Sequence, residues 1–573
     1  MHQSGAQSAV NSIEGAGMDD IGMKDLKSGG QILVDCLAAQ GTTTAFGVPG
    51  ESYLAVLDAL HDSEIRFVLC RQEGGAAFAA EAWGKLTGQP GICFVTRGPG
   101  ATNASIGVHT AMQNSSPMIL FVGQVGREMR DREAFQEIDY RAMFGTVAKW
   151  VTEVDSADRM AEIVARAYAI AQSGRPGPVV IALPEDMLVE LAASRPAPAL
   201  RIARPGAYSG TPSEAAVMLD NAKAPLILIG GGGWQGGRGL NALAEWAETA
   251  GIPIAAAFRC QDLIDNNAPV YIGDAGVGMP PHVRQLIEDA DVILALNIRF
   301  GEMVTDGYSL FDAPVPRQAL IHVHPSASEI GKIYQAKLPV HSDPEEFLQI
   351  MTVQPTYGGP SRKVRLEEAR AAYEESFHLP PQPGSLDMGA VMAHLRETLP
   401  PDAVLTNGAG NFAIWPGRLF KYGAEHRLLG PQSGAMGAGI PAAMAAKIAD
   451  PGRMVVCFAG DGDFQMTMQE LGTAMQADAP FIVLVLNNGT YGTIRMHQER
   501  DYPGRISGTT LKNPDFVKIG MAYGMHAERV EQTEEFPEAF LRAMKSQSGA
   551  LLELMIDPEA ITPRRTLSQI RGG

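Results

Sequence analysis

Short runs of Val, Ile and Leu recur along the whole chain, and stretches with helical spacing of apolar residues separate them. Examples of these runs are "IRFVLC", "PMILFVGQV", "GPVVIALP", "APLILIGGG", "MVVCFAG" and "PFIVLVLNN". Strands that are apolar on both faces are typical of parallel sheets covered by helices on each side. This alternation predicts an α/β protein built from doubly wound parallel sheets.

Pro-rich segments divide this series of strands into three parts. The chain has 573 residues, several times the usual size of one domain. Pro-rich segments lie near residues 193–208 and 378–387, and such composition is typical of linkers. We therefore expect a flexible N-terminal tail, three doubly wound domains and a C-terminal tail, over residues 1–23, 24–190, 205–355, 384–560 and 561–573.

Charge and cysteine content argue against several classes of protein. The 64 acidic and 46 basic residues give a net charge of −18, and no block of Lys or Arg would follow a nucleic-acid backbone. The five cysteines are widely spaced and form no C-x-x-C pair, which indicates a reducing setting. The N-terminal segment lacks a signal-peptide pattern, and no apolar run is long enough to span a bilayer. We expect a cytoplasmic protein that binds neither nucleic acid nor membrane.

An acidic triplet and an asparagine pair follow two neighbouring strands of the third predicted domain. Gly460-Asp461-Gly462 ends one apolar run, and Asn487-Asn488 ends the next. The residues between them predict a helix over 464–476 and a return strand, so a right-handed crossover places both motifs at one edge of the sheet. A carboxylate, an amide oxygen and a backbone carbonyl there suit Mg²⁺, with phosphate and water as further ligands. Taken singly, the motifs also fit a plain turn and a plain strand end.

Together, at this spacing, the two motifs resemble the binding motif for thiamine diphosphate (ThDP). The resemblance implies that Asp461, the Asn488 side chain and the Thr490 backbone oxygen bind Mg²⁺. It also implies that the diphosphate lies along the turn formed by Gly460, Gly462, Asp463 and Phe464.

ThDP chemistry also needs a carboxylate that hydrogen-bonds to N1′ of the aminopyrimidine, so that the 4′-amino group can take the proton from C2. Glu73, in "CRQEGGAAFAAEAWGKLTG", follows a strand and begins an Ala-rich helix of the first domain. Alone, it better fits a first-turn carboxylate that stabilises its helix. Its combination with the motifs of the third domain favours the catalytic assignment.

Residues 25–560 resemble the catalytic subunit of acetohydroxyacid synthase and related ThDP-dependent carboligases and decarboxylases. Similar stretches include "FGVPGESYLAVLDAL", "GPGATN", "SGRPGPVVIALPED" and "GAMGAGIPAA". The resemblance implies contacts with the pyrimidine, with its 4′-amine and beneath the thiazolium ring from Val48, Pro49, Gly50, Gly434 and Met436. It further implies that Gln136, beside Phe135, donates to a developing alkoxide at the reacting carbon. Without the resemblance, Met436 fits core packing, and the other two fit loop packing.

The resemblance implies three domains, termed Pyr, central and PP, and an enzyme that uses ThDP and Mg²⁺. In that chemistry a C2 ylide attacks a 2-oxo acid, CO2 is released, and the enamine passes to a carbonyl acceptor or to a proton. The two cofactor half-sites of such enzymes meet across subunits, so we expect a homodimer or homotetramer. Simple 2-oxo acid decarboxylation and a non-catalytic regulatory role remain alternatives.

Four stretches near the expected substrate site depart from the synthase pattern. The arginine that receives the second substrate's carboxylate is Met303 here, which removes a bidentate cation. His497 replaces a specificity tryptophan, Glu185 replaces a lysine, and residues 410–413 read Gly-Asn-Phe-Ala instead of Gly-Gln-His-Gln. The pattern predicts the same cofactor chemistry on a different substrate or acceptor. His497 and His109 are candidate acid or base groups, although a structural role is favoured for each.

The second predicted domain has a Gly-x-Gly-x-x-Gly pattern at Gly231, Gly233 and Gly236, between a strand and a helix. This signal for a dinucleotide keeps a flavin or nicotinamide oxidoreductase open as an alternative. Glycines also occur where any parallel strand meets its helix. Synthases bind FAD in this domain, but their acidic strand end reads His-Val-His-Pro over residues 322–325 here. The missing acid argues against FAD.

Overall fold

The computed structural model describes residues 26–208, 210–234 and 238–572. Its core contains three six-stranded sheets in which all neighbouring strands are parallel, so the predicted fold class is confirmed. Gly236 and the predicted tail over 1–23 lie outside the described residues. The exact limits between domains stay predictions.

The first sheet has the strand order β3-β2-β4-β5-β7-β6. In chain order its strands are β2 (Thr44–Gly47), β3 (Arg66–Leu69), β4 (Gly91–Val95), β5 (Met118–Gln124), β6 (Trp150–Glu153) and β7 (Pro178–Pro184). One face packs on α1 (Gly29–Ala39), α2 (Leu54–His61) and α6 (Met160–Gln172), and the other on α3 (Glu73–Thr87) and α4 (Pro99–Asn114).

The third sheet repeats this topology with the order β16-β15-β17-β18-β20-β19. Counted along the chain within each sheet, both orders read 2-1-3-4-6-5. Its strands are β15 (Val404–Asn407), β16 (Arg427–Leu429), β17 (Val455–Gly460), β18 (Ile482–Asn487), β19 (His526–Val530) and β20 (Ala550–Met555). Its longer helices are α13 (Met388–Thr398), α15 (Gly439–Ala449), α18 (Gly492–Asp501), α19 (Phe516–Ala522) and α20 (Phe536–Lys545).

The second sheet differs, with the order β11-β10-β9-β12-β13-β14. Counted in the same way this is 3-2-1-4-5-6, the arrangement of dinucleotide-binding sheets. Its strands are β9 (Leu226–Ile229), β10 (Ile254–Ala257), β11 (Tyr271–Ala275), β12 (Val292–Leu296), β13 (Ala319–His324) and β14 (Leu338–His341). Around it lie α8 (Thr211–Asn221), α9 (Arg238–Ala250), α10 (Pro281–Asp289), α11 (Pro344–Met351) and α12 (Pro360–Glu375).

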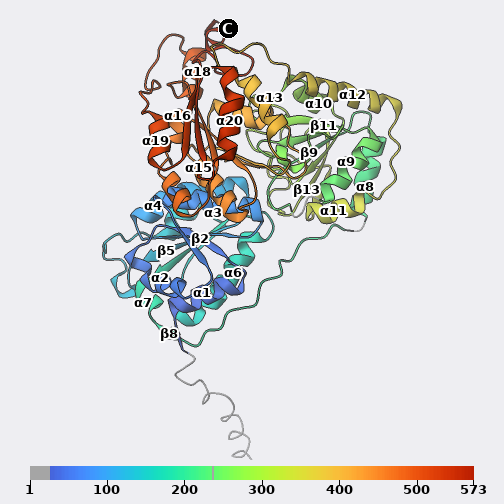
Figure 1. Ribbon diagram of the computed structural model, residues 1–573. Coiled ribbons are helices and arrows are strands. Elements are labelled where there is room, and N and C mark those ends of the chain that lie inside the picture. The colour runs from blue at the N-terminus through green and yellow to red at the C-terminus, as the bar shows by residue number, and fades with distance from the viewer. Residues whose placement is uncertain (1–25, 209, 235–237, 573) are drawn as a thin grey trace, which may run out of the picture.

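The first and third domains share one apolar core. Helix α3 lies directly against α15, where the blue and orange parts of the ribbon meet (Figure 1), and residues of both domains form one continuous buried cluster. Polar contacts strengthen this boundary, since the Glu470 carboxylate accepts from the Arg71 backbone N–H at 3.2 Å. The two half-sites predicted from sequence therefore lie on domains that pack against each other within one chain.

The helix predicted over 464–476 forms as two short helices, α16 (Asp461–Phe464) and α17 (Glu470–Gln476). Between them the backbone makes tighter turns, in which Thr467 N–H bonds to the Phe464 carbonyl. The Thr467 hydroxyl meanwhile donates to the Gly437 carbonyl at 2.6 Å. Anchoring to a neighbouring loop thus interrupts the helix that local pattern favours.

The predicted C-terminal tail contains helix α21 (Leu567–Gly572) in its described part. Apolar residues pack this segment against Met496 of α18: Ile561, Leu567 and Ile570. Arg571 also bonds to Glu499 of α18 through both carboxylate oxygens, at 2.7 and 2.9 Å. The described part of this segment is therefore packed against α18.

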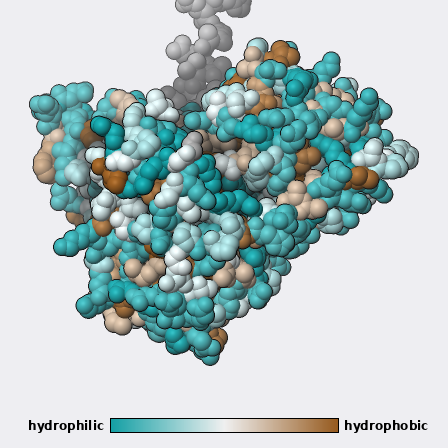
Figure 2. Space-filling model, turned by 90° about the horizontal axis from the view of Figure 1, so that it is seen from above, coloured by the Kyte–Doolittle hydropathy of each residue, from teal (hydrophilic) through white to brown (hydrophobic). Residues whose placement is uncertain are grey.

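No helix within the described residues is long and apolar enough to cross a membrane. The face of the molecule in Figure 2 is mainly hydrophilic, with apolar residues scattered among polar ones. Scattered apolar residues of this kind are ordinary on protein surfaces.

Candidate active site

A cavity of about 220 Å³ opens at the carboxyl ends of β15, β17 and β18. Ligands of open parallel sheets bind at this edge. Eight of the residues predicted to bind the cofactor or metal line it: Gly434, Met436, Gly460, Asp461, Gly462, Asp463, Asn488 and Thr490. All described residues that line the cavity belong to the third domain.

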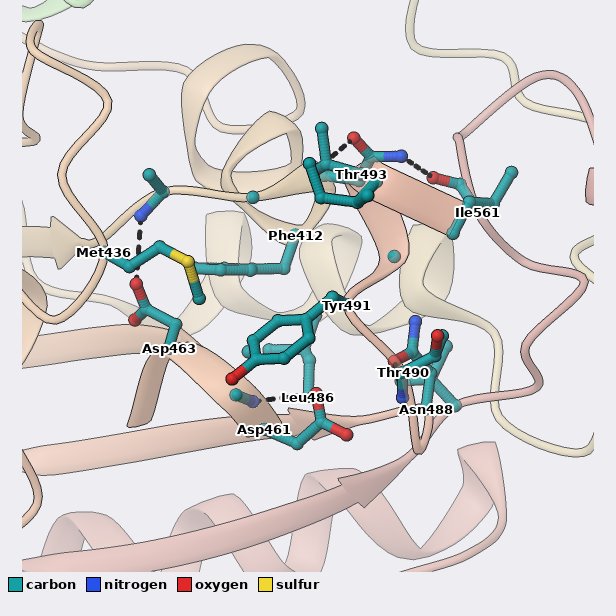
Figure 3. Close-up of a pocket in the computed structure, with 18 of the residues that line it drawn as sticks. Phe412, Met436, Asp461, Asp463, Leu486, Asn488, Thr490, Tyr491, Thr493 and Ile561 are labelled. Atoms are coloured by element: carbon teal, nitrogen blue, oxygen red, sulfur yellow. Dashed lines mark hydrogen bonds between the residues drawn. The ribbon is translucent and has the colours of Figure 1, made fainter. Parts of the chain in front are cut away.

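Asp461 occupies the first position after β17, at the floor of this cavity. Its Oδ1 atom accepts from Gly462 N–H at 2.9 Å, while the other oxygen lies toward the turn that carries Asn488 and Thr490 (Figure 3). Burial raises the pKa of Asp461, and hydrogen bonds to its oxygens counteract that rise. Among the described residues, no Lys, Arg or His forms an ion pair with it. A cation bound here would relieve the cost of burying this carboxylate.

The two asparagines after β18 have different environments. Asn487 is buried and donates to Glu553 of β20 at 2.7 Å, so its side chain links two strands of the sheet. Asn488 lines the cavity, and its Oδ1 accepts from Thr490 N–H at 3.2 Å. The strand register places the acidic triplet and the asparagine pair side by side, because Gly460 of β17 pairs with Leu486 of β18. Of the two asparagines, only Asn488 lines the cavity.

The turn after Asp461 leaves no room for a side chain at Gly462. A Cβ atom there would lie 2.4 Å from the Tyr491 ring, and Figure 3 shows that ring over the Asp461 turn. Phe464 points away from the cavity into the core, where it contacts Phe516 at a ring distance of 5.3 Å. Only its backbone could face a ligand.

Asp463 ties the loops around the cavity together. Its Oδ1 atom accepts from Ala409 N–H at 3.0 Å and from Gly437 N–H at 2.8 Å. Burial raises the pKa of Asp463 to about 7, against the opposing effect of these N–H groups and of Arg259. Its carboxylate is thus occupied by the protein, and the loop that carries Met436 is fixed beside the cavity.

The N-terminal candidates gather at the carboxyl edge of the first sheet. Val48, Pro49 and Gly50 follow β2, and Glu73 begins α3 after the neighbouring β3. A Cβ atom at Gly50 would lie 2.5 Å from Thr96, so this loop packs tightly on the end of β4. The Asn103 amide of α4 donates to Glu73 Oε2 at 2.9 Å. This group does not line the cavity of the third domain in the same chain.

Gln136 lies beside the same edge, on a loop between β5 and β6. Its φ angle is 66°, and a Cβ atom built on Gly98 would lie 2.8 Å from Gln136 Cβ. Phe135 is 72% exposed. Thus Gln136 joins the Glu73 group, whereas the Phe135 side chain contacts little of its own chain.

A larger cavity of about 960 Å³ lies between the central domain and the other two. Gly434, Asn411 and Thr493 line both cavities, so the two adjoin. Met303 and His109 line the larger one, together with Arg259 and Arg299. Burial lowers the pKa of each of these arginines to about 10. His497 is half-buried on α18 and lines neither cavity, while the preceding Met496 does.

The glycine loop of the central domain follows β9, between the two halves of its sheet. Gly231 has a φ angle of 73° and approaches Asn297 so closely that a Cβ atom would lie 2.4 Å from the Asn297 carbonyl oxygen. Close packing alone therefore explains one glycine of the fingerprint. His324 is buried at the end of β13, and burial lowers its pKa to about 3.

Two asparagines hold the first cavity in shape: Asn411, from the 410–413 stretch that departs from the synthase pattern, lines it, and Asn513, which no sequence motif marks, contacts Asp461 from outside the lining. Asn411 donates to the Ile561 carbonyl at 2.9 Å and accepts from the Thr493 hydroxyl at 2.9 Å (Figure 3). Asn513 donates to Asp461 Oδ2 at 2.7 Å. The available signal was slight, namely single polar residues within loops.

Comparison with known proteins places this geometry in a family. Family models match three successive segments: the N-terminal TPP binding domain of thiamine pyrophosphate (ThDP) enzymes over residues 27–143, the central domain over 213–351, and the C-terminal TPP binding domain over 408–554.

Individual relatives are similar over nearly the full length. The acetolactate synthase isozyme 2 large subunit of Escherichia coli is 30% identical, over 92% of this chain and 96% of the relative. The acetolactate synthase large subunit of Parasynechococcus marenigrum is 32% identical, over 92% and 87% respectively. The mitochondrial acetolactate synthase catalytic subunit of Saccharomyces cerevisiae is 30% identical, over 92% and 81%. The chain therefore belongs to the thiamine pyrophosphate enzyme family and carries the N-terminal, central and C-terminal domains of that family.

Proposed function

We propose that this protein is a ThDP- and Mg²⁺-dependent enzyme that decarboxylates a 2-oxo acid and transfers the remaining acyl unit to a carbonyl acceptor or a proton. The observation that carries the proposal is the juxtaposition of Asp461 and Asn488 at neighbouring strand ends, in a cavity next to a second, larger one. The chemistry that ThDP supplies when bound is a nucleophilic carbon and an electron sink for decarboxylation.

The residues at the floor of the first cavity fit a hard divalent cation. Asp461 contributes a buried carboxylate without an ion-pair partner among the described residues, Asn488 an amide oxygen, and Thr490 a backbone carbonyl. Three oxygen donors of this kind suit Mg²⁺, which completes its shell with phosphate and water. We assign metal binding to these three residues.

Glu73 would hold the proton exchanged with the pyrimidine ring. Asn103 engages its Oε2 atom, which orients the carboxyl group and leaves Oε1 for a ligand. Because Glu73 does not line the metal-binding cavity of its own chain, a complete site requires a second copy of the chain. We therefore propose a homodimer or a larger even-numbered oligomer as the active unit.

The acceptor side lies in the larger cavity, whose wall is apolar where synthases have an arginine. Met303 presents a thioether there, and it is 36% exposed toward the open space. A thioether cannot bind a carboxylate bidentately. We infer that an aldehyde or a proton accepts the acyl unit in preference to a second 2-oxo acid.

A substrate panel tests the proposal. Purified protein with ThDP and Mg²⁺ is supplied with 2-oxo acids that differ in side chain, each with and without an aldehyde, and CO2 and coupled product are quantified. We expect CO2 release that requires ThDP and is lost in Asp461→Ala. Calorimetry that detects no ThDP binding, together with no CO2 from any acid, would refute the function. A flavin or nicotinamide released on heating would support the oxidoreductase alternative instead.

A further inference from the structure

We propose that Arg97 is a positioning residue, which holds the 131–137 loop in a strained conformation and thereby aims Gln136 at the reaction centre. The role of Gln136 rests on the proposed function, whereas the restraint of the loop by Arg97 does not. The two parts are therefore tested separately.

The Arg97 guanidinium spans three segments at the carboxyl edge of the first sheet. Arg97 follows β4, its Nε donates to the Phe135 carbonyl at 3.2 Å, and its Nη1 donates to Glu185 Oε2 at 2.7 Å. Its side chain is only 10% exposed. Glu185 begins the short helix that follows β7. One planar cation thus joins the ends of two strands to the carbonyl directly before Gln136.

The 131–137 loop, to which Arg97 is hydrogen-bonded, is under backbone strain. Asp131, Glu133 and Gln136 have φ angles of 61°, 52° and 66°. Residues other than glycine rarely adopt positive φ angles, so a loop with three of them persists only when its surroundings hold it. Glu137 N–H donates to the Ala134 carbonyl at 2.9 Å and closes a turn in which Phe135 and Gln136 are the central residues. The peptide between these two residues can therefore flip to a relaxed conformation without breaking that bond, unless a contact from outside the turn holds the Phe135 carbonyl.

The Glu137 side chain holds the earlier part of the loop through hydrogen bonds within the loop itself. The Glu137 carboxylate accepts from Asp131 N–H at 2.9 Å, from Ala134 N–H at 3.1 Å and from Arg130 Nε at 3.2 Å. These bonds do not reach the Phe135 carbonyl. Removal of Arg97 is therefore expected to release the segment next to Gln136 without unfolding the whole loop.

The residue after Arg97 explains why the loop conformation matters for Gln136. Gly98 has a φ angle of 60°, and a Cβ atom there would lie 2.9 Å from the Gln136 carbonyl oxygen and 2.8 Å from its Cβ. The Gly98 backbone is itself held in place, because its N–H donates to the Tyr140 hydroxyl at 3.0 Å. The hydrogen bond from Arg97 to the Phe135 carbonyl thus holds Gln136 against the backbone of Gly98.

Glu185 acts as the counter-ion of this positioning residue. A largely buried guanidinium is costly unless it is paired and fully hydrogen-bonded. Glu185 stands where the synthases have a lysine, and a second cation at that position would repel Arg97. The pair therefore accounts for one of the departures from the synthase pattern.

Limited proteolysis tests the restraint without any substrate. Arg132 is exposed in the loop, so trypsin cleavage after it reports loop opening. In Arg97→Met we expect this cleavage to be roughly tenfold faster, as for the loss of one hydrogen bond from a charged group. Arg175→Met is the matched control, since Arg175 also pairs with an acid, Glu329, at 3.0 Å and is 12% exposed, but it does not contact the loop. It should leave cleavage after Arg132 unchanged even where it lowers the melting temperature.

Double-mutant kinetics test whether Arg97 acts through Gln136. With a 2-oxo acid that the panel shows to be decarboxylated, Arg97→Met should lower kcat by at least tenfold while ThDP affinity stays within twofold of wild type. In a Gln136→Ala background the same substitution should change kcat by less than twofold, because residues that act as a unit are non-additive. Glu185→Gln should give a smaller loss, since it keeps the contact of Arg97 with the Phe135 carbonyl.

Two results would overturn the proposal. If cleavage after Arg132 in Arg97→Met equals that in wild type, or rises only in step with cleavage elsewhere, Arg97 does not restrain the loop. If Arg97→Met lowers kcat as strongly in the Gln136→Ala background as alone, it does not act through Gln136. Should no 2-oxo acid react, the proposed function fails, and the proteolysis result alone decides the restraint.

Discussion

Asn513 donates a hydrogen bond of 2.7 Å from its side-chain amide to Asp461 Oδ2, across 52 positions of sequence. The same nitrogen also reaches Asn487 Oδ1 at 2.8 Å. One amide therefore links the ends of β17 and β18 and fixes the carboxylate that we assign to the metal. Residues behind a metal ligand commonly orient it in this way.

Replacing Asn513 by Ala should weaken Mg²⁺ binding about tenfold, the lower end of the range for groups that orient metal ligands. Asp461 would lose the donor that holds its Oδ2 atom. Titration calorimetry of the protein with Mg²⁺ and ThDP measures the change. Asn267→Ala is the matched control, because Asn267 also donates to an aspartate, Asp265, at 2.9 Å, but in the central domain. Equal affinity in the Asn513 variant and wild type would contradict the assignment.

Replacing Glu73 by Gln should lower turnover by roughly 10²-fold or more, the usual scale of a lost proton-transfer group. ThDP binding should persist, because the amide keeps the size and hydrogen-bonding capacity of the side chain. Steady-state CO2 release and calorimetry together separate the two effects.

The control for Glu73→Gln is Glu81→Gln on the same helix. Glu81 also accepts from an asparagine amide, Asn114, at 2.7 Å, but it is buried away from the sheet edge. This variant should alter thermal stability more than turnover. If both substitutions reduced turnover alike, Glu73 would have no special place in the chemistry.

The sequence predicts best what depends on a strand and the turn that directly follows it. Asp461 and Asn488 follow continuous apolar strands, and parallel pairing brings such strand ends to one edge whatever lies between them. The same reasoning places Val48 and Glu73 at one edge of the first sheet. For these residues, local pattern and topology are sufficient.

Contacts between loops are not encoded in any periodic pattern. Asn513 and Arg97 each meet their partners through loops whose paths depend on the packing of whole domains. The expected helix over 464–476 fails for the same reason, because Thr467 bonds to a distant carbonyl. On α18, one residue turns the helix face by about 100°, so Met496 lines the larger cavity while His497 does not. Alignment with the synthase pattern alone does not resolve that difference.

Replacing Met303 by Arg should shift the products made from a 2-oxo acid toward the hydroxy-oxo acid that results from self-condensation. A guanidinium in the wall of the larger cavity would bind the carboxylate of a second 2-oxo acid. We expect at least a tenfold rise in the ratio of coupled product to aldehyde, measured by chromatography. Met303→Leu, which keeps the wall apolar, should leave the ratio at the wild-type value. A ratio that is the same in both variants would show that residue 303 does not face the acceptor.

The attachment of α21 to α18 should depend on pH through Glu499. Hydrogen bonds from Arg571 and from Gly504 N–H lower the pKa of Glu499 to about 2, from 4.5. Because the pKa is lowered by folding, the contribution of Glu499 to stability is complete above its pKa in the unfolded chain and is lost as the pH falls from about 4.5 to about 2.

Trypsin cleavage after Arg565 cannot be followed at such pH, so pepsin susceptibility of the C-terminal segment, read by mass spectrometry, is the suitable measurement. Glu499→Gln should remove this pH dependence and leave the segment as accessible at pH 5 as at pH 2.5. Glu528→Gln, which removes the partner of Arg542 at 2.6 Å, should retain the wild-type profile. A Glu499 variant that still followed the wild-type profile would show that the pairing of Glu499 with Arg571 does not cause the pH dependence.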